Sequence, residues 1–148
     1  MAPGTAKRYF RLDEVNGLVI RLSDLFSQVM QLRGQLKTLY ARLDEADCPP
    51  TNDPTPEDEA RVPPEMRRDR SVFYALAETL RERLEEIAAT GCVIKDLEIG
   101  LVDWPALHHG REVWLCWKYG EREVFFWHDI HTGFAGRRPV SELVESES

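Results

Sequence analysis

The chain has 148 residues, a net charge of −7, and a composition of 43% hydrophobic and 30% charged residues. These values are typical of a soluble globular protein with one hydrophobic core. No apolar stretch approaches the roughly 18 residues of a membrane span, and residues 1–10 lack the apolar run of a secretory signal. We therefore expect a cytoplasmic protein with a single domain over residues 1–148 and no membrane partner.

The acidic residues are concentrated in two segments. Residues 44–59 contain seven acidic and no basic residues, and the predicted acidic tail, residues 141–148, contains three acidic and no basic residues. The rest of the chain is near neutral to slightly basic. The net charge therefore argues neither for nor against a nucleic-acid partner.

The chain contains three cysteines, which are Cys48, Cys92 and Cys116. Their odd number and wide spacing fit neither a disulfide framework nor a paired-cysteine zinc site. We expect three reduced thiols.

A long amphipathic helix is predicted over about residues 13–46. Its apolar residues recur at alternating steps of three and four, which is the spacing of a narrow coiled-coil seam. The seam consists of Val15, Leu18, Leu22, Leu25, Val29, Leu32, Leu36, Leu39 and Leu43. Gly17 and Gly34 each weaken this helix by up to about 1 kcal/mol relative to alanine. The seam must therefore be buried to stabilise the helix.

Residues 47–63 are predicted to be a mobile acidic linker. Six of the nine prolines lie between Cys48 and Pro64, and the segment has too few apolar residues to form a core. We expect this linker to be dispensable for folding.

A second helix, antiparallel to the first, is predicted over residues 64–90. Pro64 suits the first helical position, and Gly91 suits the left-handed position that ends a helix. The apolar stripe of this helix comprises Met66, Phe73, Leu76, Leu80, Leu84 and Ile87.

Residues 92–138 are predicted to form a small antiparallel sheet of about three to four strands that ends in a Gly-Arg-Arg loop. The hydrophobic period changes from near 3.6 to 2 after Gly91. The candidate strands are Val93–Leu97, Leu101–Trp104, Glu112–Lys118 and Glu123–His128. We expect the second strand to end at Trp104, because Pro105 follows it.

The last two strands are expected to form a hairpin with a two-residue turn at Gly120 and Glu121. This turn places Cys116 opposite Phe125. The other predicted pairs are Lys118–Glu123, Trp117–Val124, Leu115–Phe126, Trp114–Trp127 and Val113–His128. A shifted register with Cys116 opposite Glu123 loses favourable cross-strand pairs, so we predict the register with Cys116 opposite Phe125.

Several short motifs follow one another along this region and make the chain recognisable. They are Lys95-Asp96-Leu97, Gly100-Leu101-Val102-Asp103-Trp104-Pro105-Ala106, Gly110-Arg111-Glu112-Val113-Trp114-Leu115-Cys116-Trp117, Gly120-Glu121, Phe126-Trp127-His128 and Gly133-Phe134-Ala135-Gly136-Arg137-Arg138-Pro139. Together with Tyr9-Phe10 before a long helix, they resemble the bacterial family known as domain of unknown function 2203. The resemblance covers nearly the whole chain except the linker and the tail, and it implies no reaction. Arg11 stands where the family usually has a threonine that caps the first helix, and His131 stands where it more often has a carboxylate.

His128 and His131 have the His-x-x-His spacing found in zinc and iron sites, and Cys116 and Asp103 could lie near them in the folded sheet. A divalent metal bound by His128 and Asp103 is therefore one candidate. The simpler interpretation is that His128 is a partly buried imidazole hydrogen-bonded to a carboxylate. We expect no other cofactor.

The carboxylates of Asp96 and Asp103 have apolar neighbours in sequence and need a partner, because an unpaired buried charge costs several kcal/mol. Arg111, Arg137 and Arg138 are the available partners, and a structural ion-pair network is the simpler interpretation. The alternative is a ligand site formed by Asp96, Asp103, Arg111, His128, Arg137 and Arg138. In that site the glycine-rich loop and its arginines would bind a carboxylate or a phosphate.

Other common chemistries lack their residues. No serine, cysteine or threonine has a histidine and a third orienting group at a readable spacing, so nucleophilic catalysis is not supported. The glycine spacings of nucleotide-binding loops are also missing. Lys118 and Arg122 are balanced by Glu121 and Glu123, unlike the basic aromatic strands of proteins that bind single-stranded nucleic acids. We expect no nucleic-acid partner.

The predicted fold is α+β, with a long antiparallel helical hairpin packed on the small antiparallel sheet. Two functions are consistent with it. The first is a non-enzymatic interaction or assembly protein that forms a homodimer through coiled-coil contacts of its helices. The second is a small-ligand-binding or metal-dependent enzyme with a site at the sheet edge. A seam about 50 Å long extends beyond strands of about 17–20 Å, which favours the first.

Overall fold

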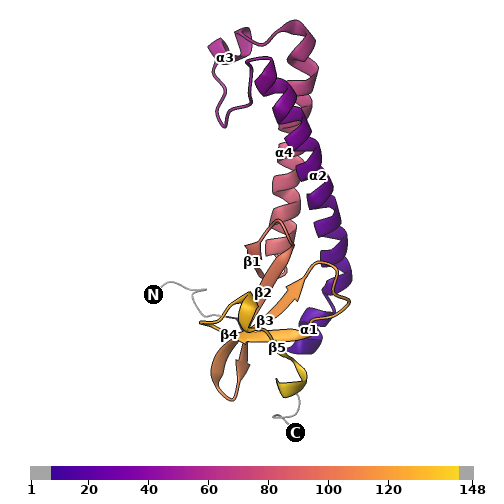
Figure 1. Cartoon of the computed structure of the whole chain (residues 1–148), viewed down its shortest axis with the longest axis vertical. Helices are drawn as coiled ribbons and strands as arrows, with labels where there is room; N and C mark the ends of the chain where they lie inside the picture. Colours follow the sequence, from indigo (N-terminus) through magenta and orange to yellow (C-terminus); the bar gives the residue numbers. More distant parts are fainter. Residues whose placement is uncertain (1–7, 144–148) are drawn as a thin grey trace. The chain divides into compact units, whose positions relative to one another are not determined.

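The computed structural model describes residues 8–143 and is an α+β protein (Figure 1). In chain order the elements are α1 (Leu12–Asn16), α2 (Val19–Glu45), α3 (Pro56–Ala60), the 3-10 turn η1 (Pro64–Met66), α4 (Arg67–Ala88), β1 (Val93–Asp96), β2 (Leu101–His108), β3 (Arg111–Lys118), β4 (Phe126–Asp129), the 3-10 turn η2 (Phe134–Gly136) and β5 (Arg138–Pro139). They group into two compact units, one with the chain up to Phe26 and from Ile87 onward, the other with Ser27–Glu86. None of the described helices is long and apolar enough to cross a membrane.

The sheet lies in the first unit and has five antiparallel strands in the order β1-β2-β3-β4-β5. The prediction of three to four strands is wrong, because the segment expected to be only a Gly-Arg-Arg loop contains β5. Arg138 and Pro139 of this strand pair with Trp127 and Phe126 of β4. A strand of two residues gives no periodic signal in the sequence.

Strand β2 is longer than predicted, because it continues through Pro105 to His108. Beyond Asp103 the strand has no pairing to β1, so a missing N–H on that side removes no ladder hydrogen bond. The backbone oxygen of Pro105 instead accepts a 2.8 Å hydrogen bond from the N–H of Phe10. The strand then turns into β3 through His109 and Gly110, which both have positive φ, as a type I′ turn requires.

The β3–β4 register differs by one residue from the prediction. Cys116 lies opposite Phe126 instead of Phe125. A shift of one residue moves every side chain of a strand to the other face. As a result His128, and not Trp127, shares a face of the sheet with Cys116.

The predicted turn at Gly120 and Glu121 is replaced by a turn around Tyr119 and Gly120, and Glu121 makes three contacts next to it. Its N–H donates to the Lys118 backbone oxygen at 3.0 Å, and its carboxylate accepts from the Lys118 N–H at 2.7 Å. The indole Nε1 of Trp117 donates to the backbone oxygen of Glu121 at 2.9 Å. Because β4 begins only at Phe126, residues 121–125 form a loop that follows this turn.

One face of the sheet carries the hydrophobic core of the first unit. The ring of Trp117 lies 6.0 Å from that of Phe26 in α2, measured between centroids. Other fully buried side chains of this unit are Val15, Leu22, Val102, Trp104, Val113, Leu115 and Trp127. The opposite face carries Asp103, Cys116 and His128, which follows from the strand registers.

The single helix predicted over residues 13–46 is two helices in the structure. α1 ends at Gly17, and α2 begins at Val19. The side-chain oxygen of Asn16 accepts a 2.7 Å hydrogen bond from the N–H of Val124, which ties the end of α1 to the loop before β4. At the start of α1, the Arg11 N–H donates to the Glu14 carboxylate at 3.0 Å, so the first turn is closed without a threonine.

In the second unit, α2 and α4 contact each other at both ends. The Arg83 Nε donates to the Gln28 side chain at 2.9 Å, and Arg42 forms a 2.8 Å ion pair with Asp69. These contacts pair an early residue of one helix with a late residue of the other, so within this unit the two helices run antiparallel.

The segment expected to be a linker contributes to the core of the second unit, contrary to the prediction. It holds α3, which begins at a capping box between Thr55 and Asp58. Cys48 and Val62 are buried together with Leu43. Sequence composition misses this because only two apolar side chains of the segment are involved.

The second predicted helix begins at residue 64 as the turn η1, continues as α4, and ends close to Gly91 as expected. Gly91 has φ of 93°. A Cβ atom at this position would lie 2.2 Å from Cζ of Phe10. Only glycine fits both the backbone conformation and this close approach.

Candidate functional site

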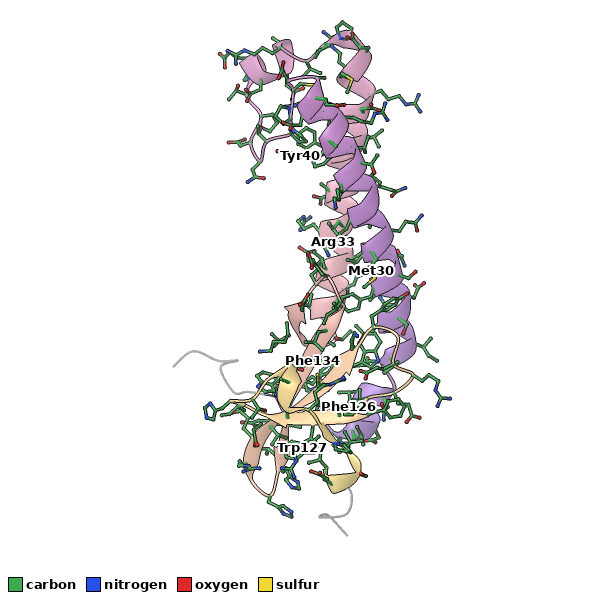
Figure 2. All side chains as sticks on the ribbon, in the orientation of Figure 1. Met30, Arg33, Tyr40, Phe126, Trp127 and Phe134 are labelled. Carbon is green, nitrogen blue, oxygen red and sulfur yellow. The ribbon has the colours of Figure 1, made fainter. Side chains whose placement is uncertain are left out.

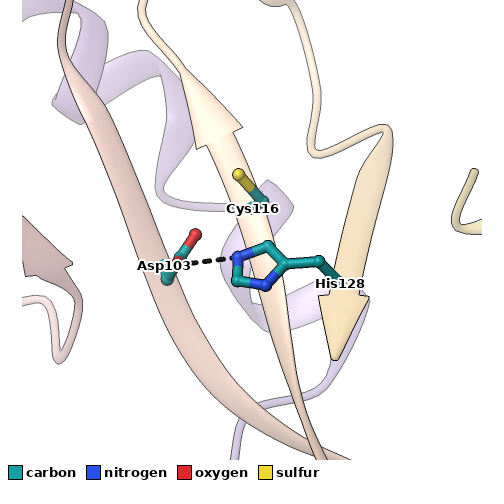
Figure 3. Close-up of side chains that lie close together, drawn as sticks. All are labelled: Asp103, Cys116 and His128. Atoms are coloured by element: carbon teal, nitrogen blue, oxygen red, sulfur yellow. Dashed lines mark hydrogen bonds and ion pairs between the residues drawn. The ribbon is translucent and has the colours of Figure 1, made fainter. Parts of the chain in front are cut away.

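Three polar side chains from neighbouring strands meet on one face of the sheet, and we call them the Asp-Cys-His cluster (Figure 3). Asp103 of β2 lies directly opposite Cys116 of β3. His128 of β4 is two residues beyond Phe126, the residue opposite Cys116, and therefore reaches the same face. One ligand atom of each residue lies within 4.8 Å of the other two.

All three side chains are buried, with 2% of Asp103, 2% of His128 and 0% of Cys116 exposed. Burial of polar groups is costly unless they form hydrogen bonds. The ring atom Nε2 of His128 lies 2.9 Å from Oδ2 of Asp103, and Nδ1 lies 2.8 Å from the backbone oxygen of Asp129. The second oxygen of the carboxylate, Oδ1 of Asp103, has no hydrogen-bond partner among the described residues.

One of these contacts fixes which ring nitrogen of His128 donates to the backbone. A backbone oxygen can only accept, so Nδ1 of His128 donates to Asp129. The imidazole is thus oriented by the backbone oxygen of the next residue, and Nε2 points to Asp103.

Burial raises the pKa of the Cys116 thiol to about 12, and the neighbouring charge of Asp103 adds to this effect, while Arg137 opposes it. A thiol with such a pKa is not a nucleophile at neutral pH. The metal-free cluster therefore does not resemble the Cys-His pair of a thiol enzyme.

Arg137 lies at the side of this cluster. Its guanidinium forms a 2.6 Å ion pair with Glu121 and lies over the rings of Phe126 and Phe134, with its central carbon 4.1 and 4.9 Å from their centroids. The turn η2 supplies Phe134. The loop that we expected to bind an anion thus holds its first arginine between two aromatic rings and a carboxylate.

The structure brings together only some of the predicted site residues. Asp103 and His128 are in contact, and Arg137 lies close enough to influence Cys116. Asp96 instead accepts hydrogen bonds from the N–H groups of Glu98 and Ile99 at 3.0 and 3.4 Å and so stabilises a turn.

The other predicted residues face different partners. Arg111 forms a 3.2 Å ion pair with Asp129. Arg138 lies over the ring of Trp127 and forms a 2.9 Å ion pair with Glu142. His131 is exposed.

Cys116 was expected to lie near the histidines but was not among the predicted site residues, and Glu121 was not expected in the site. Cys116 could have been found from the strand pairing alone, since β2 and β3 are joined by a short turn at Gly110 and the hydrophobic pattern places Asp103 opposite it. The hydrogen bonds of Glu121 could not be predicted from the sequence, because the sequence between β3 and β4 resembles that of a tight turn.

A second candidate surface is an open apolar groove in the second unit, with a volume of about 540 Å³. It lies between residues of α2 and α4. The lining residues are Met30, Gln31, Gly34, Gln35, Thr38, Leu39, Val72 and Leu76, and none of them is charged. Figure 2 labels Met30 on α2. A Cβ atom at Gly34 would meet nothing within 4 Å, so the groove is open there.

Comparison with known proteins agrees with the motifs in the sequence. No curated protein and no solved structure matches the chain significantly. The family model described as "Uncharacterized conserved protein (DUF2203)" matches residues 8–140, which include both helical segments, the sheet and the Asp-Cys-His cluster. The chain therefore belongs to this uncharacterised conserved family, domain of unknown function 2203.

Proposed function

We propose that the protein is a non-enzymatic assembly protein that forms a homodimer through the helices of its second unit. The observation that carries this proposal is the incomplete burial of the apolar residues between the two ends of α2 and α4. In α2, Leu32 and Leu43 are buried. The leucines between them in α2, and those of the facing part of α4, are only partly buried; they are Leu36, Leu39, Leu76, Leu80 and Leu84. Two helices bury only the sides that face each other, but four helices enclose a complete core.

A second copy of the chain is the occupant that this surface fits best. A groove without charged lining residues can meet the same groove of another copy across a two-fold axis. The neighbouring charges are complementary as well. Over residues 31–41, α2 carries only Arg33 and Lys37, whereas over residues 75–86, α4 carries four glutamates and two arginines.

Arg33 and Lys37 form no ion pair within the described part of the chain, while both arginines of the α4 segment are paired with its own glutamates. The remaining negative charge of α4 can therefore attract α2 of a partner copy. This arrangement corresponds to the predicted coiled-coil dimer, with the helical hairpin as its dimerisation element.

The alternative function, a small-ligand-binding or metal-dependent enzyme at the sheet edge, has less support. Three of its six residues, Asp96, Arg111 and Arg138, contact partners outside the Asp-Cys-His cluster. The cluster that remains is buried, and its thiol is not activated.

Two matched variants test the dimer. Val72 lines the groove and is 38% exposed, and Ile20 is 87% exposed in the first unit. Light scattering after size exclusion should show a dimeric parent, a monomeric Val72→Glu variant and a dimeric Ile20→Glu variant. A dimer that persists in Val72→Glu would place the interface elsewhere, and a monomeric parent would remove the proposal.

A further inference from the structure

We propose that Asp103, Cys116 and His128 form a binding site for one divalent transition-metal ion of the zinc or cobalt type. This inference is independent of the dimer. The donor set is one carboxylate oxygen, one thiol sulfur and one imidazole nitrogen, which are the ligand types that zinc uses in three-ligand sites. Each donor comes from a different strand of one sheet, so the site is built on rigid elements.

The spacing of the donors is close to that of a bound metal. Metal–ligand distances of about 2.0–2.3 Å in a tetrahedron correspond to distances of about 3.3–3.8 Å between ligand atoms. The three donor atoms lie within 4.8 Å of one another, with Nε2 of His128 and Oδ2 of Asp103 at 2.9 Å. A shift of about 1 Å or less for each side chain therefore suffices to enclose an ion.

His128 is already oriented in the way that metal-binding histidines are. Such a histidine donates its second ring N–H to a carboxylate or a backbone oxygen, which fixes the ring and leaves the other nitrogen for the metal. Here Nδ1 donates to the Asp129 backbone oxygen at 2.8 Å, and Nε2 faces the carboxylate of Asp103.

Asp103 supplies a second, independent observation. Its Oδ1 atom is buried and has no hydrogen-bond partner among the described residues, although buried carboxylate oxygens are nearly always satisfied. A metal ion bound by one oxygen of Asp103 would leave the other oxygen to accept a hydrogen bond from a water on the metal. A buried acceptor without a partner, beside a thiol and an imidazole, is therefore suited to bind a cation.

The charges also balance. A carboxylate and a thiolate together carry two negative charges, which a divalent ion neutralises, so the loaded site is neutral in its buried environment. Arg137 lies beside Cys116 and favours the thiolate form. With three protein ligands, the fourth position would be taken by water.

Cobalt titration tests this site directly, because Co²⁺ bound to a thiolate absorbs in the near ultraviolet and its visible bands report tetrahedral geometry. Chelator-treated full-length protein should bind one Co²⁺ per chain with a thiolate charge-transfer band, and Zn²⁺ should displace it. Cys116→Ser should lose the band. Asp103→Asn and His128→Gln should weaken binding by at least about 100-fold, since even outer partners of metal ligands contribute 10–100-fold.

Cys92→Ser is the matched control, because Cys92 is also buried and its thiol faces the backbone oxygen of Ile87. This variant should keep the band and the stoichiometry. A parent protein that stays folded by circular dichroism and shows no charge-transfer band would overturn the proposal, whether or not the variants fold. So would a band that survives in Cys116→Ser or disappears in Cys92→Ser.

Discussion

Nε2 of His128 lies 2.9 Å from Oδ2 of Asp103, and both side chains are buried on the same face of the sheet. Asp103 is thus paired with an imidazole, as the simpler interpretation of His128 expected, and not with an arginine. This difference changes what substitutions at the two positions should do.

Asparagine should replace Asp103 at little cost in the metal-free protein. Because Nδ1 of His128 donates to Asp129, Nε2 can accept a hydrogen bond from the asparagine amide. We expect Asp103→Asn to lower the free energy of unfolding by less than about 1 kcal/mol, and Asp103→Ala to lower it by about 3 kcal/mol, because alanine leaves Nε2 buried without a partner. Urea unfolding in the presence of chelator measures both. Equal losses of unfolding free energy for the two variants would contradict the assignment of Nδ1 as the donor to Asp129.

The Cys116 thiol should be unreactive in the folded, metal-free protein. With a pKa of about 12, roughly one thiol in ten thousand is ionised at pH 8, and only the thiolate reacts. Reactivity should rise with pH, because the thiolate fraction grows tenfold for each pH unit below the pKa. Maleimide labelling followed by mass spectrometry, before and after denaturation in urea, checks this. Rapid labelling of Cys116 at pH 8 without denaturant would disprove the assigned burial.

Arg70 should be essential for the stability of the second unit. It is 3% exposed, and its guanidinium donates to the backbone oxygens of Cys48 and Pro49 at 2.9 and 3.0 Å. We expect Arg70→Met to lower the free energy of unfolding by about 2–4 kcal/mol, because it leaves two buried acceptors without donors. Arg68 is exposed and gives the control. Arg68→Met should change the free energy of unfolding by less than about 0.5 kcal/mol.

The same contacts predict that residues 49–61 cannot be exchanged freely. Replacing them with a Gly-Ser linker should lower the urea midpoint, because a flexible linker no longer holds the backbone oxygen at position 49 against Arg70, and the cap of α3 is lost. An unchanged midpoint would restore the original expectation that this segment is dispensable.

Gly91 and Gly110 separate backbone strain from steric clash. Both have positive φ, but only at Gly91 would a Cβ atom meet Phe10, at 2.2 Å. We expect Gly110→Ala to cost about 1 kcal/mol from its backbone alone, and Gly91→Ala to cost about 2–4 kcal/mol. Thermal or urea unfolding of both variants tests the difference. In a Phe10→Ala background the extra cost at Gly91 should largely disappear, and its persistence would contradict the proposed clash.

Local signals in the sequence predicted much of this fold. The change of period after Gly91 separates the helices from the sheet, and Gly91 follows closely on the end of α4. Each of these features depends on residues that are neighbours in sequence. The break at Gly17 was missed, and next to it the Asn16 side chain accepts a hydrogen bond from Val124, a contact that local sequence cannot show.

The candidate site was predicted only in part for the same reason. Asp103 and His128 were selected because polar residues stand out among apolar ones, but their contact requires the observed β3–β4 register. That register goes with a longer connection between β3 and β4, in which the Glu121 side chain accepts a hydrogen bond from Lys118. In the predicted register, Trp127 would share the face of Cys116, and His128 would point to the opposite face.

The most direct test of the proposed assembly function is sedimentation equilibrium of the parent chain over a micromolar concentration series. The incompletely buried helices of the second unit predict a molar mass of about 34 kDa, twice the 17.1 kDa of one chain, with dissociation only at the lowest concentrations. A mass of 17.1 kDa throughout the series would contradict the proposal.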